Sequence, residues 1–306
     1  MKTRIVRASR PALALAAVML TAAACGGSSE ASGSSSASSG LQEDADIASL
    51  VPEAVAEEGV LTVGTAVYPP AVIVEDQGSD PTGWDIATIA DAAALMGLDV
   101  EYNVTQWDGL ITGLEANRFD VALGEMAILP ERTELVTFVH NHDSGVAFIV
   151  KGDSDLSVID SVDDVCGLRV AVLLGSSEQK SVQDYAAECE TKGLDPLTVD
   201  TFKDQATANL AVTEGRVDAS LSSASQAVYV VEQTGDALKV VNNDFAPLVP
   251  TGVALAKTDY SDEMAVALQA AIQKLIDDGR LQEILDEYNG GLGGIETAKI
   301  VPEPAA

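Results

Sequence analysis

Two stretches of the chain, LEANRFDVAL at residues 114–123 and VTEGRVDASL at residues 212–221, repeat one pattern. In each, a helical segment ends at a residue that tolerates left-handed backbone geometry, Asn117 or Gly215. An arginine follows, and then a strand that begins at an aspartate, Asp120 or Asp218. The same helix-turn-strand unit used twice predicts two α/β lobes of like construction.

The residues before the first of these stretches alternate β-rich runs with helical periodicity. Residues 61–66 read as a first strand, residues 100–104 as a second, and apolar residues at helical spacing over 86–94 predict a helix between them. Asp108 is expected to cap the next helix, which runs to Ala116. This alternation is typical of an α/β fold with mostly parallel strands.

The N-terminus has the layout of a secretory signal over residues 1–24, because four basic residues precede an apolar run at residues 11–24. That run is shorter than the roughly 17 to 25 residues that a membrane-spanning helix needs. Small residues then lead into Cys25, which resembles a bacterial lipobox, in which the cysteine is acylated. We therefore expect a lipidated Cys25 and a Ser/Gly-rich tether over residues 25–58; the alternative is ordinary cleavage that leaves a free thiol.

The charge balance indicates which partners to exclude. The chain has 17 Lys and Arg against 48 Asp and Glu, a formal net charge of −31. Such a surface repels phosphates, which argues against nucleic-acid binding and against adhesion to anionic lipid. We expect an extracytoplasmic monomer that meets the membrane only through its lipid anchor, and we expect no cofactor, since the chain has no nucleotide-binding loop.

Besides Cys25, the chain has two cysteines, Cys166 and Cys189. In an exported protein two such cysteines most often pair, so a disulfide is expected between them. It would close a loop of about 23 residues and stabilise the fold by about 3 kcal/mol in the chain-entropy model. A metal site is the alternative, but it lacks further cysteines and a nearby histidine.

Several motifs together resemble the family 3 extracellular solute-binding proteins of ABC importers, the polar amino-acid type. They are LTVGTAVYPP at 61–70, TGWDI at 82–86, WDGLI at 107–111, RFD at 118–120, PER at 130–132, GSS at 175–177, GRVD at 215–218 and DGR at 278–280. The resemblance implies a periplasmic-binding-protein type II fold, in which two α/β lobes joined by a two-strand hinge close around a ligand. Lobe 1 would comprise residues 59–147 and 250–290, lobe 2 residues 148–249, and a C-terminal tail residues 291–306.

The same resemblance implies the function: capture of an amino acid or related zwitterion between the lobes and delivery to the membrane subunits of an ABC transporter. Arg132 is the strongest candidate for ligand contact. Pro130 suits the first position of a helix, which places Arg132 in the first turn, where the helix dipole disfavours a cation. In the family the matching arginine grips the ligand carboxylate. The alternative is a salt bridge to Glu131 or Glu134.

Two further groups of ligand-binding residues come from the resemblance. Tyr68 and Trp107 match aromatic positions that sandwich the ligand side chain. Ser176 and Ser177 match residues that close lobe 2 over the carboxylate, although simple helix capping by serine would look the same. The full predicted set is Tyr68, Trp107, Gly124, Glu125, Ala127, Arg132, Leu173, Ser176, Ser177 and Ser223.

Three members of this set depart from the family pattern. Ser223 stands where an aspartate usually binds the ligand ammonium, Ala127 where a Ser or Thr helps bind the carboxylate, and Glu125 where Gly or Ser is usual. A buried carboxylate needs a cationic partner. Glu125 is therefore expected to meet either a cation of the ligand or the guanidinium of Arg132.

Two other classes of function compete with this interpretation. Some dehydratases that act on cyclohexadienyl acids share the resemblance, and catalysis would need a positioned acid or base. His140 and His142 are the only histidines; with Asp143 they could also bind a metal. We expect them beyond a strand that ends at Val139, exposed or at the mouth of the cleft. A solute-sensing lipoprotein is the other alternative. We predict neither an enzyme nor a metal site.

Overall fold

A computed structural model describes residues 40–76, 78–242, 245–288 and 293–303. The expected signal at 1–24, the expected lipidated Cys25 and most of the expected tether lie outside these residues. Among the described residues, none of the helices combines the length and the apolar character needed to span a bilayer.

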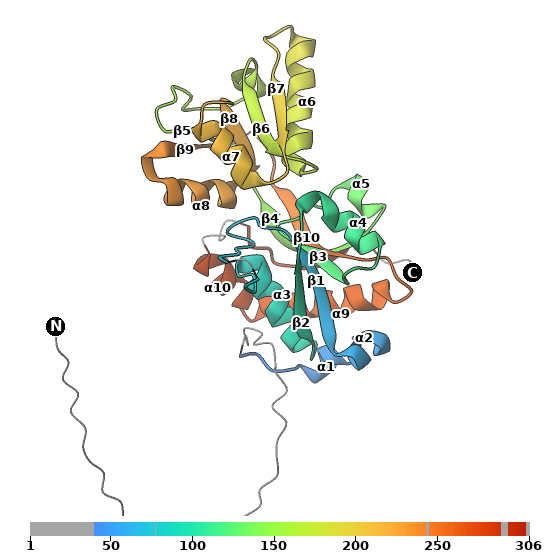
Figure 1. The fold of residues 1–306 in the computed structure, drawn as a ribbon. Coiled ribbons are helices and arrows are strands. Elements are labelled where there is room, and N and C mark those ends of the chain that lie inside the picture. Colours follow the sequence, from blue (N-terminus) through green and yellow to red (C-terminus); the bar gives the residue numbers. More distant parts are fainter. Residues whose placement is uncertain (1–39, 77, 243–244, 289–292, 304–306) are drawn as a thin grey trace, which may run out of the picture. The chain divides into compact units, whose positions relative to one another are not determined.

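The first sheet has six strands in the order β11-β4-β10-β3-β1-β2 (Figure 1). β1 pairs in parallel with β2 and β3, whereas β10 runs antiparallel between β3 and β4. The strands are β1 Val60–Thr65, β2 Asp99–Val104, β3 Val121–Leu123, β4 Thr137–Ser144, β10 Val249–Leu255 and β11 Lys299–Val301. The two strands predicted before residue 105 are confirmed.

Helices with small buried side chains pack near this sheet. Buried alanines on α3 (Trp84–Leu95) and α9 (Ser261–Asp277) let the two helices approach each other closely, and both belong to one hydrophobic core. α10 (Arg280–Glu287) packs against both. The helix expected to begin at Asp108 differs from the prediction: Asp108 lies in a 3₁₀ turn, η1 (Trp107–Gly109), and α4 (Leu110–Glu115) begins without a side-chain cap.

Both ends of the described chain join the core of lobe 1. Residues expected to be tether form α1 (Ala45–Ala48) and α2 (Glu53–Glu58), and their apolar side chains Ile47 and Val55 are buried in the same core as α9. At the other end, β11 lies in the expected tail and pairs with β4. Lobe 1 therefore extends beyond residues 59–147 and 250–290, because these apolar residues are buried and β11 is hydrogen-bonded in the sheet.

The second sheet has five strands in the order β7-β6-β8-β5-β9 (Figure 1). β6 pairs in parallel with β7 and β8, and β5 runs antiparallel between β8 and β9. The strands are β5 Val146–Lys151, β6 Arg169–Leu173, β7 Thr198–Phe202, β8 Ala219–Ser223 and β9 Leu238–Asn242. The helices of this lobe are η2 Val162–Val165, α6 Ser177–Lys192, α7 Gln205–Thr213, α8 Ala224–Thr234 and η3 Gly235–Ala237.

The repeated sequence unit forms the same structure in both lobes. Asn117 and Gly215 adopt left-handed backbone geometry, with φ of 50° and 69°. After each turn an aspartate carboxylate accepts a hydrogen bond from the backbone N–H of a neighbouring strand: Asp120 from Thr62 of β1, at 2.9 Å, and Asp218 from Arg169 of β6, at 2.8 Å. The repeat therefore fixes how β3 and β8 join their sheets, which is a structural role.

The chain crosses between the two sheets twice, each time between two consecutive strands that belong to different sheets. β4 ends at Ser144 in the first sheet, and after Gly145 the chain enters β5 of the second. It returns between β9 and β10, across the residues that follow Asn242. Two α/β sheets connected in this way confirm the predicted two-lobed fold.

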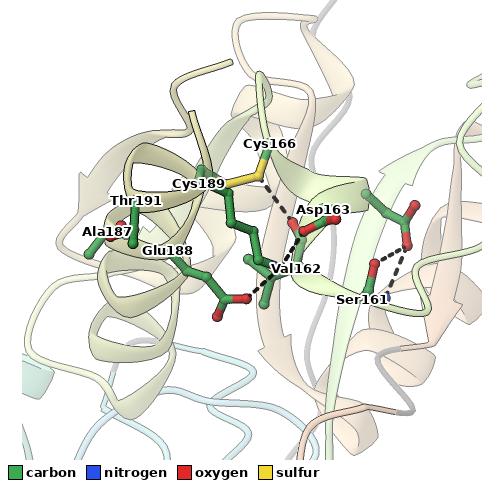
Figure 2. The surroundings of a disulfide bond; sticks show 10 residues. Ser161, Val162, Asp163, Cys166, Ala187, Glu188, Cys189 and Thr191 are labelled. Carbon is green, nitrogen blue, oxygen red and sulfur yellow. Dashed lines mark hydrogen bonds and ion pairs between the residues drawn. A yellow bond between two sulfur atoms is a disulfide. The ribbon is translucent and has the colours of Figure 1, made fainter. Parts of the chain in front are cut away.

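The predicted disulfide is present between Cys166 and Cys189, with Cα atoms 5.7 Å apart (Figure 2). It joins the segment after η2 to α6. Asp163 of η2 and Glu188 of α6 both form ion pairs with Lys192, so ionic contacts reinforce the same junction. These side chains are half exposed, and we attribute little stability to them.

Candidate functional site

Arg132 is buried, with 8% of its surface exposed, although it lies on α5 (Pro130–Thr133), a single helical turn. Its guanidinium donates to the carbonyl oxygen of Ala127 at 2.8 Å and to that of Gly175, in lobe 2, also at 2.8 Å. No ion pair joins Arg132 to Glu131 or Glu134 among the described residues, so the salt-bridge alternative is not what holds it. The arginine links the two lobes and keeps further N–H donors for another acceptor.

The two aromatic candidates lie beside this guanidinium. The rings of Tyr68 and Trp107 have centroids 6.2 Å apart, and the Arg132 guanidinium carbon lies 5.8 Å from the centre of the Trp107 ring. The Tyr68 hydroxyl accepts a hydrogen bond from the backbone N–H of Ser223 at 3.0 Å, which makes a second contact between the lobes. Tyr68, Trp107 and Arg132, three of the predicted ligand-binding residues, therefore lie together near the contact between the lobes.

The loop after β3 places Gly124, Glu125 and Ala127. One carboxylate oxygen of Asp85, in the first turn of α3, accepts the backbone N–H of Gly124 at 2.9 Å and that of Glu125 at 2.7 Å. Its other oxygen accepts from the Asn141 amide at 3.2 Å. Burial raises the pKa of Asp85 to about 6, and these hydrogen bonds oppose the rise. Sequence reasoning missed Asp85, since an acidic residue at a helix start is common for dipole reasons alone.

Glu125 has its side chain in the site, with 8% of its surface exposed. Its carboxylate accepts hydrogen bonds from Ser144 at 2.5 Å, at the end of β4, and from two lobe 2 serines, Ser223 at 3.0 Å and Ser225 at 3.1 Å. Burial raises the pKa of Glu125 to about 7, and the hydroxyls oppose this rise. No ion pair joins Glu125 to Arg132 among the described residues, so self-neutralisation within the site is not observed.

Four candidates come from lobe 2, at the end of a strand or just after it. Leu173, the last residue of β6, is buried in the cluster that contains Tyr68. Ser176 caps α6 by accepting the N–H of Gln179, which is the ordinary capping role. Ser177 donates to the adjacent Glu178 at 3.1 Å. Ser223 caps α8 as well as donating to Glu125, because its hydroxyl also accepts the N–H of Gln226.

A small cavity lies between these groups. Its volume is about 10 Å³, roughly the room of one water molecule. An amino acid does not fit there, so the lobes must separate to admit one. The residues that line it are Glu125, Ala127, Ser144, Val146, Ser177, Glu178, Ser223, Val249 and Thr251.

A larger, open hollow of about 680 Å³ lies in lobe 1 near Asn117, Asp120 and Tyr260. It contains none of the predicted ligand-binding residues. We place the candidate site at the small cavity because residues of both lobes line it, among them the buried carboxylate of Glu125 and the partly buried carboxylate of Glu178.

The expectation for the two histidines is wrong. Both lie within β4 rather than beyond its end, and His142 is buried, with 3% of its surface exposed, against the Trp84 ring at 4.7 Å between centroids. Burial lowers its pKa to about 4. His140 pairs with Asp143 at 2.9 Å. β4 continues beyond the predicted strand end at Val139 to Ser144 and so includes both histidines. Neither of them lines the cavity.

Comparison with known proteins shows the family to which the chain is similar. Residues 61–291 match the family described as bacterial extracellular solute-binding proteins, family 3. An arginine-binding protein of Corynebacterium glutamicum is 26% identical over 260 residues, 85% of this chain and 84% of the relative. An L-cystine-binding protein of Escherichia coli K12 is 29% identical over 77% of this chain and 85% of the relative. The crystal structure of an ancestral amino-acid-binding protein, a precursor of cyclohexadienyl dehydratase, has a TM-score of 0.67 at 27% identity, covering 78% of this chain and 98% of that one.

Proposed function

The chain belongs to the bacterial extracellular solute-binding proteins of family 3, and from this premise we propose that it captures an amino acid for an ABC importer. The observation that carries the proposal is the position of Arg132, a buried guanidinium that contacts both lobes. A cation buried at a closing interface is costly unless it receives an anionic partner. The carboxylate of an amino acid supplies that partner.

Arg132 can bind a carboxylate through two parallel N–H···O bonds, for which its planar fork is suited. The ligand would then replace the contact with the Gly175 carbonyl, which comes from the opposite lobe. Closure of lobe 2 would bring Ser177 toward the same carboxylate, and the rings of Tyr68 and Trp107 would cover the ligand side chain. Each lobe supplies part of the site, so binding and closure are coupled.

We further propose the cellular setting. The signal at residues 1–24 and the lipidated Cys25 would hold the folded part outside the membrane as a monomer, and the membrane subunits of the transporter would receive the closed form. Mass spectrometry of the mature N-terminus tests the anchor: a diacylglyceryl Cys25 is expected, and an unmodified cysteine would overturn this part.

Catalysis is not part of the proposal. The related proteins named above are binding proteins, and a dehydratase needs an acid or base beside its substrate. Neither His140 nor His142 lines the cavity, and their positions on β4 explain them as structural residues of the sheet.

Isothermal titration of the purified protein with single amino acids tests the proposed function. We expect at least one to bind with micromolar affinity or better. Arg132→Ala should weaken that binding 100-fold or more, since each hydrogen bond to a charged group contributes about 1.5–3 kcal/mol. Arg132→Lys should lose part of this binding affinity, because a lysine ammonium cannot form the bidentate contact with a carboxylate.

Arg169→Ala is the matched control. Arg169 forms an exposed ion pair with Asp200 at 2.7 Å on the edge of the second sheet, so its removal should leave affinity unchanged. Full affinity in Arg132→Ala, with Arg169→Ala equally unaffected, would remove Arg132 from ligand contact and overturn the proposal.

A further inference from the structure

Glu125 is held in an unfavourable backbone conformation. Its φ is 57°, and among the described residues Asn117 is the only other non-glycine residue with positive φ. Asn tolerates that region through its short polar side chain, whereas glutamate has no such compensation. The backbone N–H groups of Gly124 and Glu125 are both fixed by Asp85. Strain that the surrounding structure maintains in this way marks a residue whose side-chain direction matters.

The strained backbone directs the Glu125 carboxylate into the cavity. There it receives three serine hydroxyls from two lobes, Ser144, Ser223 and Ser225. These hydroxyls satisfy its hydrogen-bonding capacity but do not neutralise its charge. Among the described residues, no arginine or lysine side chain forms an ion pair with the Glu125 carboxylate. A buried carboxylate that is hydrogen-bonded yet unneutralised is disfavoured, and its pKa is raised accordingly, to about 7.

The charges around the cavity do not balance. Glu178, in the first turn of α6, lines the same cavity and lies near enough to raise the pKa of Glu125 further. Arg132 lies near enough to Glu178 for that carboxylate to raise its pKa, and its guanidinium donates to backbone carbonyls. Exposed Glu131 lies beside Arg132 and adds no positive charge. Glu125 and Glu178 thus supply two carboxylates against the one guanidinium of Arg132. The carboxylate of a ligand bound to Arg132 would add a further negative charge, and a zwitterionic ligand as a whole would leave the excess of one negative charge unchanged.

We infer that Glu125 is the cation-recognising residue of this cleft and that the ligand carries a net positive charge, as a basic amino acid does. The inference rests on the proposed function for the carboxylate end of the ligand. In it, Arg132 receives the anionic end, and Glu125 receives a cationic group that enters from the side of Ser223 and Ser225. The specificity of the protein then follows from charge complementarity across the closed lobes.

Isothermal titration at pH 8, where Glu125 is ionised, tests this with five probes: L-arginine, L-lysine, L-glutamine, L-cystine and agmatine. We expect arginine or lysine to bind at least 100-fold more tightly than glutamine and cystine. Glu125→Gln should reduce this preference to below tenfold while the fold, followed by circular dichroism, is retained. Glu115→Gln, which removes an exposed carboxylate from α4 of the same lobe, should leave the preference unchanged.

The outcomes separate the two proposals. Tight binding of glutamine or cystine that Glu125→Gln does not alter would overturn this inference and leave the proposed function standing. Agmatine, which lacks the carboxylate of arginine, binding as tightly as arginine and through Glu125 would support the cation site and overturn the role of Arg132. Failure of all five probes while another amino acid binds would overturn this inference alone, and failure of every single amino acid to bind would overturn both proposals.

Discussion

Asp85 gives the sharpest test of how the site is held. Its carboxylate accepts two buried backbone N–H groups, from Gly124 and Glu125, and one amide N–H from Asn141. In Asp85→Ala the two backbone donors would remain buried without a partner, at about 1–3 kcal/mol each. We therefore expect the free energy of unfolding to fall by about 2–6 kcal/mol. Asp85→Asn should lose about half as much, because its amide oxygen still accepts.

The assay is urea unfolding at pH 7.5, followed by the fluorescence of Trp84 and Trp107, the only tryptophans. Ligand affinity should fall in both Asp85 variants, since Glu125 loses its support. Asp91→Asn is the control: Asp91 is also buried in α3, but it pairs with Arg280 at 2.7 Å. It should lose stability and keep affinity. An Asp85→Ala protein within 1 kcal/mol of wild type and with unchanged affinity would refute the reasoning.

Three further predictions follow from particular contacts. Burial raises the pKa of Glu125 from 4.5 to about 7, so the free energy of unfolding of the wild type should fall as pH rises between these values. Glu125→Gln should match the wild type in stability at pH 4.5 and exceed it by about 3 kcal/mol at pH 8. Parallel curves of stability against pH for the two proteins would contradict this. Replacing both Cys166 and Cys189 by serine should lower the free energy of unfolding in urea by about 3 kcal/mol and leave ligand affinity unchanged. A loss of binding free energy as large as the loss of stability would contradict a purely structural role for the disulfide. Gly64→Ala would place a Cβ against the Phe119 ring and should cost about 1–3 kcal/mol in unfolding free energy. Phe119→Leu in the same chain should partly restore this stability, and an unchanged stability of Gly64→Ala would show that the ring can move aside.

Local patterns predicted the elements whose determinants are local. β1, β2 and α3 follow from strand alternation and helical spacing, and the turns at Asn117 and Gly215 follow from residues that tolerate left-handed geometry. The disulfide followed from cysteine number and compartment. Such features need no knowledge of which segment meets which.

Features set by distant contacts were not predictable in the same way. β11 has only three residues, Lys299–Val301, and forms because β4 offers an edge for pairing. β4 continues through His140 and His142 because β10 pairs with it along that length, from Leu255 to Val249. Asp85 looks like an ordinary helix-start residue until the loop after β3 is placed against it. The sequence contains these residues but not the contact that gives them a role.

The two departures at positions 125 and 223 depend on each other. The Ser223 hydroxyl lies 3.0 Å from the Glu125 carboxylate and also caps α8. An aspartate at 223, as the family resemblance would lead one to expect, could cap the helix equally well. It would, however, place a second carboxylate against Glu125, and two such groups at that distance cannot both ionise. The serine hydroxyl at 223 avoids this conflict, because it is a neutral donor to the Glu125 carboxylate, and lobe 1 then supplies the buried carboxylate that the resemblance would place in lobe 2.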